Sequence, residues 1–355
     1  MVKKRHRSSS RDYEDRRSKA ATTYTGDVIN GVPVITKLNV RDLEPGMLHR
    51  FMFKGADMNI GQSWYVPVIV AKGINNGERL MLITGIHGDE LNGTRSMHAV
   101  FEEIDPSKLS GTLIGVVQAS PNALFHVSRN WFLSTDGGKY ENMNRVFPGK
   151  ITGNTAEVQA YKLWHDLWKG NANYVIDMHS QSTDTEYGLF IYADKHLKDA
   201  ERLARQFPAD HIIFDNGDDG TVENTFDDDD VPSITLEIGG GRQFQEEYVN
   251  RAVEGIQNVL VELKMIEGEK RRTAKEYDTY IGYETDSIYA EMCGYAEVLV
   301  NIGDNIDKGQ IVALQRNPFG DILKKYYATT SGQVVSIGTG ATREAVGLLV
   351  RILTD

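Results

Sequence analysis

The chain of 355 residues contains a single cysteine, Cys293, and has no long apolar run. One cysteine excludes an internal disulfide and fits a reducing compartment. The apolar runs are too short for a membrane span or for the core of a signal peptide. We therefore expect a cytoplasmic protein with no membrane partner. The composition, 40% hydrophobic and 25% charged, is that of a globular protein, and the length allows two domains.

Basic charge is concentrated at the N-terminus. Residues 1–20 hold eight Lys or Arg against three acidic residues, whereas the whole chain has a net charge of −11. The remainder is strongly acidic, so nucleic acid is not an expected partner. The basic segment has few apolar residues and cannot repay the entropy of ordering. We expect residues 1–25 to form a disordered tail, with contact to RNA or an anionic membrane as the alternative.

The most informative stretch runs from Gly85 to Glu90 and contains His87. It follows the apolar run 80–83, which predicts a buried strand, and its glycines predict a tight turn at the strand's end. His87 and Glu90 are three residues apart, so a helical bend would direct both side chains to one side, where they could bind one zinc ion. The same spacing is also common in solvated polar turns.

A second buried strand is predicted where Tyr174 to Met178 leads into His179. A histidine at the end of a strand could supply a third ligand and leave the fourth position to water, as in catalytic zinc sites. Asp177 points to the same side as His179 and could accept a hydrogen bond from the ring nitrogen that does not bind metal. The sequence thus predicts one zinc ion per chain, bound by His87, Glu90 and His179.

Further apolar runs of strand length alternate with predicted helices. The strands are expected at 64–70, 113–117, 189–192, 212–214 and 231–237, and the helices at 92–104, 154–168, 195–206 and 244–264. This alternation predicts an α/β fold with a mixed, largely parallel sheet and helices on both faces. Ligands of such sheets usually bind beyond the carboxyl ends of strands, where His87 and His179 both lie.

The helix expected at 154–168 begins with a capping-box pattern, Asn154 followed by Glu157. Trp164 and Trp168 are four residues apart and are expected in the core, whereas His165 is expected on the surface.

Four motifs occur in an informative order: His87 to Glu90, Asn144 to Gly149, Asp177 to His179, and Thr235 to Gly240. Together they resemble the succinylglutamate desuccinylase/aspartoacylase family, a branch of the zinc carboxypeptidase-like fold. The resemblance extends from about residue 60 to the C-terminus. It implies a zinc carboxypeptidase-like catalytic domain, which we place at residues 26–266, and a small N-acyl amino acid as substrate.

The resemblance also implies roles for individual residues. Asn144 and Arg145 would hold the substrate's carboxylate, for which arginine is suited by its two parallel hydrogen bonds. Arg129, in the same long polar segment 121–149, would stabilise the oxyanion together with the metal. Glu237 would act as general base on the zinc-activated water. Surface ion pairs are the structural alternative for the arginines, and a salt bridge for Glu237.

Asn142 departs from the family pattern, because aspartoacylase-like members carry an acid before the Asn-Arg pair. A supporting role beside the metal ligands is therefore not carried over to it.

Two acidic clusters lie at 215–219 and 227–230. They lack the oxygen-ligand spacing of a helix-loop-helix calcium site. Two interpretations remain open: solvated loops, or an acidic flank of the site that favours a cationic group on the substrate.

After a charged linker at 267–276, the chain changes to short β-rich runs punctuated by glycine. Residues 277–355 resemble the half-barrel of biotinyl and lipoyl carrier domains, so we expect a small all-β domain. A carrier presents a lysine at a hairpin tip, whereas the tip here is predicted at 317–320, with Lys324 and Lys325 beyond it on a strand. A carrier function is therefore not expected, and the family resemblance implies instead a domain that walls the active-site entrance.

The sequence thus predicts a zinc-dependent amidohydrolase that removes a small acyl group from an N-acyl amino acid. A metallocarboxypeptidase acting on short peptides and a non-catalytic metal-binding protein are the alternatives. The sequence does not select the acyl group or the amino acid, and it leaves open a homo-oligomer.

Overall fold

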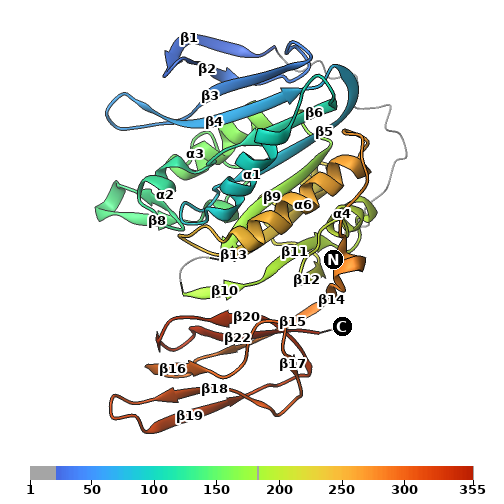
Figure 1. The fold of residues 1–355 in the computed structure, drawn as a ribbon. Helices are drawn as coiled ribbons and strands as arrows, with labels where there is room; N and C mark the ends of the chain where they lie inside the picture. Colours follow the sequence, from blue (N-terminus) through green and yellow to red (C-terminus); the bar gives the residue numbers. More distant parts are fainter. Residues whose placement is uncertain (1–20, 182–183, 355) are drawn as a thin grey trace, which may run out of the picture.

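The computed structural model describes residues 21–181 and 184–354. Its largest element is an 11-stranded mixed sheet with the order β1-β2-β3-β4-β6-β5-β9-β13-β11-β12-β14 (Figure 1). The strands are β1 (Thr23–Ile29), β2 (Val32–Lys37), β3 (Met47–Asp57), β4 (Ser63–Lys72), β5 (Asn75–Thr84), β6 (Ser110–Val116), β9 (Tyr174–Gln181), β11 (Leu189–Asp194), β12 (His211–Asp215), β13 (Ser233–Gly240) and β14 (Tyr280–Gly282). Residues 1–20 of the expected tail lie outside the described residues. The strand β1 begins at Thr23, within the segment 1–25 that the sequence assigns to the tail.

The centre of this sheet is parallel. β5 pairs in parallel with β6 and β9, and β9 pairs in parallel with β13. The neighbours on either side are antiparallel, β4 to β6 and β11 to β13. Because β5, β9 and β13 run in one direction, their carboxyl ends meet at one edge of the sheet.

Helices cover both faces of the sheet, as Figure 1 shows. Hydrophobic residues of α1 (Asn92–Glu103), α4 (Lys198–Ala204) and α6 (Glu246–Glu262) pack in one core, and those of α3 (Thr155–Lys162) and α5 (Val222–Asp228) pack in another. β5 alternates between the two cores: Leu80 and Leu82 belong to the first, Met81 and Ile83 to the second. The predicted mixed α/β fold is confirmed.

The helix predicted at 154–168 forms in two parts. Asn154 caps α3 through a complete capping box with Glu157, as the sequence predicts. The chain then continues as a π-helix, Leu163–Trp168. Trp164 and Trp168 are buried and His165 is exposed, as expected.

The polar segment 121–149, predicted to be irregular, contains short regular elements. They are α2 (Pro121–Phe125), the antiparallel pair β7 (Trp131–Leu133) and β8 (Lys139–Glu141), and single turns of 3-10 helix at Thr135–Gly137 and Met143–Arg145. The segment is therefore a folded unit beside the edge of the sheet.

The C-terminal part contains two smaller sheets with a hydrophobic core of their own. Their elements are β10 (Thr185–Tyr187), β15 (Glu284–Tyr289), β16 (Gly294–Val298), β17 (Asn305–Ile306), β18 (Ile311–Arg316), β19 (Ile322–Tyr327), β20 (Gly332–Gly338), β21 (Thr342–Arg343) and β22 (Leu348–Thr354), preceded by the short helix α7 (Ala274–Tyr277). The turn at 317–320 joins β18 to β19, and Lys324 and Lys325 lie on β19, as predicted.

Two strands connect the large sheet with these smaller ones. β14 lies in the segment 277–355 that the sequence assigns to the C-terminal domain, but it pairs with β12 of the large sheet. Conversely, β10 follows closely after β9 and pairs with β20. Among the helices of residues 21–181 and 184–354, none has the length and hydrophobicity to span a bilayer.

Candidate active site

His87 and Glu90 lie in the turn between the end of β5 and the start of α1. Gly88 allows the following segment to pass against this turn, because a Cβ there would come within 2.0 Å of the backbone of Ala123. The Gly88 N–H donates to the carbonyl oxygen of Ser128 at 2.9 Å. The turn thus directs His87 and Glu90 inward, and each is 2% exposed.

The three predicted metal ligands converge on one buried point. His87 Nδ1 lies 2.9 Å from Glu90 Oε1, and His179 Nδ1 lies 2.8 Å from Glu90 Oε2. The two ring nitrogens are 3.2 Å apart. His179 comes from β9, which is parallel to β5, so the parallel register brings the third ligand to the turn after β5. One potential ligand atom from each residue lies within 4.8 Å of the others.

The outer nitrogen of each imidazole contacts a polar side chain. His179 Nε2 lies 2.8 Å from Asp177 Oδ2, the contact that the sequence predicts. Asp177 is fully buried. His87 Nε2 lies 3.0 Å from Asn142 Oδ1, a contact that the sequence does not predict. Both rings therefore turn Nδ1 toward the centre and hold Nε2 in outer contacts, which is how histidine ligands are oriented.

Glu90 keeps a negative charge at the buried centre, and the pKa values of the two imidazoles shift in opposite directions. Burial would raise the pKa of Glu90, but His87 and His179 hold it well below its ordinary value. Burial lowers the pKa of His87. Burial would also lower the pKa of His179, but Asp177 and Glu90 raise it well above its ordinary value. A cation held by two imidazole nitrogens and one carboxylate would balance the charge of Glu90, and zinc is well suited to that donor set.

Glu237 lies next to this centre. β13 runs parallel to β9, and their register sets Glu237 opposite His179. The side chain is 9% exposed, and its Oε2 has no hydrogen-bond partner within the described part of the chain. Burial raises the pKa of Glu237 to about 7. A buried carboxylate oxygen with no partner, beside a metal-ligand set, is suited to accept a proton.

Two residues that sequence reasoning does not single out connect the ligand turn with Glu237. Asn92, at the start of α1, donates through Nδ2 to the Ile238 carbonyl oxygen at 2.7 Å and accepts from the Gln245 N–H at 2.9 Å. Gln181, at the end of β9, hydrogen-bonds the Glu237 side chain. Neither residue stands in a recognisable motif. The register of β9 and β13 brings Gln181 to the site, and Asn92 is there because α1 begins directly after the ligand turn.

The predicted substrate-binding residues differ in their positions. Arg129 reaches the centre, where its Nη1 donates to Glu90 Oε1 at 2.8 Å. Arg145 is about half exposed and pairs with Asp218, Nη2 to Oδ2 at 3.1 Å. The Asn144 side chain accepts from the Val222 N–H at 2.9 Å, so it holds the start of α5.

The two acidic clusters have different structures. The first, 215–219, lies beside Arg145 through Asp218. The second, 227–230, is a loop only in its second half, because α5 extends to Asp228 and residues 229 and 230 form a turn. Asp227 is buried and accepts from the Ser233 N–H at 2.9 Å, so it caps the start of β13.

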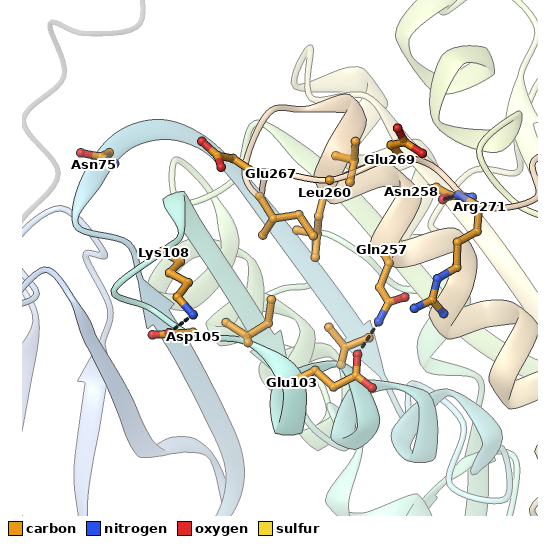
Figure 2. Close-up of a pocket in the computed structure, with 15 residues that line it drawn as sticks. Asn75, Glu103, Asp105, Lys108, Gln257, Asn258, Leu260, Glu267, Glu269 and Arg271 are labelled. Carbon is orange, nitrogen blue, oxygen red and sulfur yellow. Dashed lines mark hydrogen bonds and ion pairs between the residues drawn. The ribbon is translucent and has the colours of Figure 1, made fainter.

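A cavity of about 630 Å³ lies elsewhere, at the far ends of α1 and α6 (Figure 2). Val100 of α1 and Leu260 of α6 contribute to its apolar lining, and Glu103 and Gln257 form a hydrogen bond at its side. Both helices begin beside the ligand turn and end here, so the 12 residues of α1, about 18 Å of helix, separate the cavity from the metal-ligand set.

The comparisons with known proteins agree with this geometry. The family model of the succinylglutamate desuccinylase/aspartoacylase catalytic domain matches residues 76–263. The chain belongs to this family. The match contains His87, Glu90, His179 and Glu237, and it confirms the family that the four motifs predict.

The chain is also similar to individual members of this family. An N-alpha-acetyl-L-2,4-diaminobutyric acid deacetylase from Halomonas elongata is 27% identical over 282 residues, which are 76% of this chain and 79% of that protein. The product-bound ectoine utilization protein of Ruegeria pomeroyi has a TM-score of 0.78 at 22% identity, over 87% of this chain and 96% of that one. A succinylglutamate desuccinylase/aspartoacylase from Rhodobacter sphaeroides has a TM-score of 0.76 at 19% identity, over 88% and 98%. These structural likenesses show the shared fold.

Proposed function

We propose that this protein is a zinc-dependent deacylase that removes a small acyl group from an N-acyl amino acid. One observation carries the proposal: the Nδ1 atoms of His87 and His179 converge with the Glu90 carboxylate on one buried point, and Glu237 lies beside it. Family membership and the deacetylase from Halomonas elongata support the same class of reaction.

His87, Glu90 and His179 would hold one zinc ion per chain. Held by these residues, zinc would polarise the acyl carbonyl and lower the pKa of a bound water molecule. Glu237 accepts the proton of the attacking water at Oε2 and returns it to the leaving amine. Its pKa of about 7 suits both steps, because the carboxylate can take up and release a proton near neutral pH.

Two arginines would act on the substrate. Arg129 contacts Glu90 and so lies close enough to the ligands to stabilise negative charge on the acyl oxygen. Arg145 is accessible from solvent and can bind the substrate's carboxylate through two hydrogen bonds, with Asn144 supporting the turn that carries it.

The ion pair between Arg145 and Asp218 suggests which amino acids fit. A substrate with both a carboxylate and a side-chain ammonium could pair with Arg145 and Asp218 respectively. The substrate in the name of the Halomonas elongata relative, N-alpha-acetyl-L-2,4-diaminobutyric acid, carries both groups. We therefore include N-acyl diamino acids among the candidate substrates.

The test is amine release from N-acetyl, N-formyl and N-succinyl derivatives of acidic, neutral and diamino acids. Each is assayed with and without a chelator, and zinc is added back afterwards. The proposal predicts release from at least one N-acyl amino acid, its loss with the chelator and its recovery with zinc. Amine release that the chelator does not reduce would contradict the zinc mechanism.

The same assay separates the alternatives. A metallocarboxypeptidase with these ligands would cleave unblocked dipeptides and leave N-acetyl amino acids intact. A non-catalytic metal-binding protein would hold zinc and release amine from neither set. Glu237 Oε2 lies beside the ligands and has no partner in residues 21–181 and 184–354, which favours a catalyst over a binding protein.

A further inference from the structure

We propose that Asn142 is a positioning residue that fixes His87 in its metal-binding tautomer and that, as a neutral amide, it sets the zinc affinity below the value a carboxylate would give. The inference rests on the proposed function, because it takes zinc as the metal of the His87, Glu90 and His179 centre. The inference is drawn from the pair of contacts that Asn142 Oδ1 makes, one with His87 and one with the backbone of Asn144.

The backbone identifies that atom. The Asn144 N–H points at the Asn142 amide at 2.9 Å, and Asn142 is the N-cap of the turn Met143–Arg145. A backbone N–H can only donate, so the amide atom facing it must be the acceptor oxygen and not the nitrogen. This removes the usual ambiguity about which way an asparagine amide points.

The orientation of Asn142 in turn determines the tautomer of His87. The same Oδ1 lies 3.0 Å from His87 Nε2. Because an amide oxygen accepts and never donates, Nε2 must carry a hydrogen. In the neutral ring the lone pair then lies on Nδ1, the atom that faces Glu90 at 2.9 Å. Without Asn142, the two tautomers of His87 would compete and only one could bind metal.

The two histidine ligands differ in the charge of their outer partners. His179 has the fully buried carboxylate of Asp177, whereas His87 has a neutral amide. An anionic partner increases the basicity of a ligating imidazole and attracts the cation, and loss of such partners typically costs 10- to 100-fold in metal affinity. An aspartate at position 142 could accept the same two hydrogen bonds and add a negative charge.

Two substitutions separate this role from simple capping of the turn. Asn142→Ser keeps an oxygen that can cap the Asn144 N–H, but its side chain is too short to reach His87 as well. Asn142→Asp keeps both contacts and adds the charge. Asn154→Ser is the matched control, because Asn154 caps α3 in the same manner away from the centre.

The measurement is zinc affinity of the full chain, stripped of metal and titrated in competition with a chromogenic chelator at constant pH and ionic strength. We expect Asn142→Ser to bind zinc roughly 10- to 100-fold more weakly than the wild type. We expect Asn142→Asp to bind more tightly and Asn154→Ser to match the wild type. The melting temperature of each zinc-free variant shows whether its fold is intact.

Each outcome is decisive. Wild-type affinity in Asn142→Ser would overturn the inference. If that variant does not fold, Asn142→Asp decides, and an affinity equal to or below that of the wild type would overturn it. Failure of the proposed function is recognised separately, because the wild-type chain itself would then bind no zinc or release no amine.

Discussion

At the scale of single residues, the site is defined by which polar atoms have partners and which do not. Each imidazole uses Nε2 for an outer contact and keeps Nδ1 for the centre. Among the described residues, Glu237 Oε2 and Asp177 Oδ1 are buried without a partner, and of these two carboxylates Glu237 is the one that binds neither imidazole. Unsatisfied buried acceptors are costly, so they are expected where a ligand or a reacting group completes them.

Arg145 gives the first prediction at this scale. Arg145→Met should lower kcat/KM by roughly 10- to 100-fold, because charge-assisted hydrogen bonds to a carboxylate contribute about 1.5–3 kcal/mol. Stability should change little, since the ion pair with Asp218 is exposed. Steady-state kinetics and the melting temperature test this, with Arg205→Met, another exposed arginine, as control. An unchanged kcat/KM would show that Arg145 does not bind the substrate.

Glu223 gives a second prediction, on stability. It is 5% exposed on α5 and hydrogen-bonds Thr235, and burial together with the neighbouring Asp227 raises its pKa well above the ordinary value. The folded state therefore favours the protonated acid. Its stabilising contribution is complete below the unfolded-state pKa of about 4.3 and is lost as the pH rises through the folded-state pKa.

Glu223→Gln replaces the protonated acid by an amide that does not titrate. The variant should gain stability relative to the wild type as the pH increases, by about 1.4 kcal/mol per pH unit between the two pKa values. Urea unfolding at pH 5 and pH 8 measures this, and Glu247→Gln on the surface is the control. If Glu223→Gln differs from the wild type in the free energy of unfolding by the same amount at pH 5 and pH 8, Glu223 is not a buried acid with a raised pKa.

At the scale of elements, the parallel strands β5, β9 and β13 place the site. Their carboxyl ends bring together residues 87–90, 177–179 and 237, which are far apart in the chain. The sequence predicts these strands because each is a short apolar run, and it predicts the ligands because they follow those runs directly. The same local signals predict α1, α6 and the capping box of α3.

The missed features depend on contacts that local patterns do not encode. Asn142 and His87 are 55 positions apart, and Gln181 meets Glu237 only through the pairing of β9 with β13. The acidic run 227–230 looks like a solvated loop, yet Asp227 is buried because it caps the start of β13. The change from α3 to a π-helix at Leu163 likewise cannot be predicted from the spacing of the apolar residues.

The capping box of α3 gives a prediction at this scale. Asn154 Oδ1 accepts from the N–H groups of Ala156 and Glu157 at 2.9 and 3.0 Å, and Glu157 returns a bond to the Asn154 N–H. Asn154→Ala should reduce the free energy of unfolding by about 1 kcal/mol, whereas Asn154→Asp should preserve it. Urea unfolding of both variants tests this, and an equal loss in both would show that capping is not the cause.

At the scale of the whole molecule, the C-terminal part is joined to the strand that carries His179. β10 follows β9 closely and pairs with β20, and the Arg351 guanidinium donates to the Tyr187 hydroxyl at 2.6 Å. A small core that includes Tyr187, Phe190 and Leu353 lies between the two parts. We propose that residues 277–355 form the β-domain expected from the sequence and that it supports the site from this side, with β14 remaining in the large sheet.

The most direct test of the central claim compares the wild type with Glu237→Gln for zinc per chain and for amine release from the best N-acyl amino acid of the panel. The account predicts about one zinc ion in both proteins and equal substrate binding. It predicts turnover at least about 100-fold lower in the variant, because only the proton acceptor is lost. Full activity in Glu237→Gln, or a wild type that is active without zinc, would contradict it.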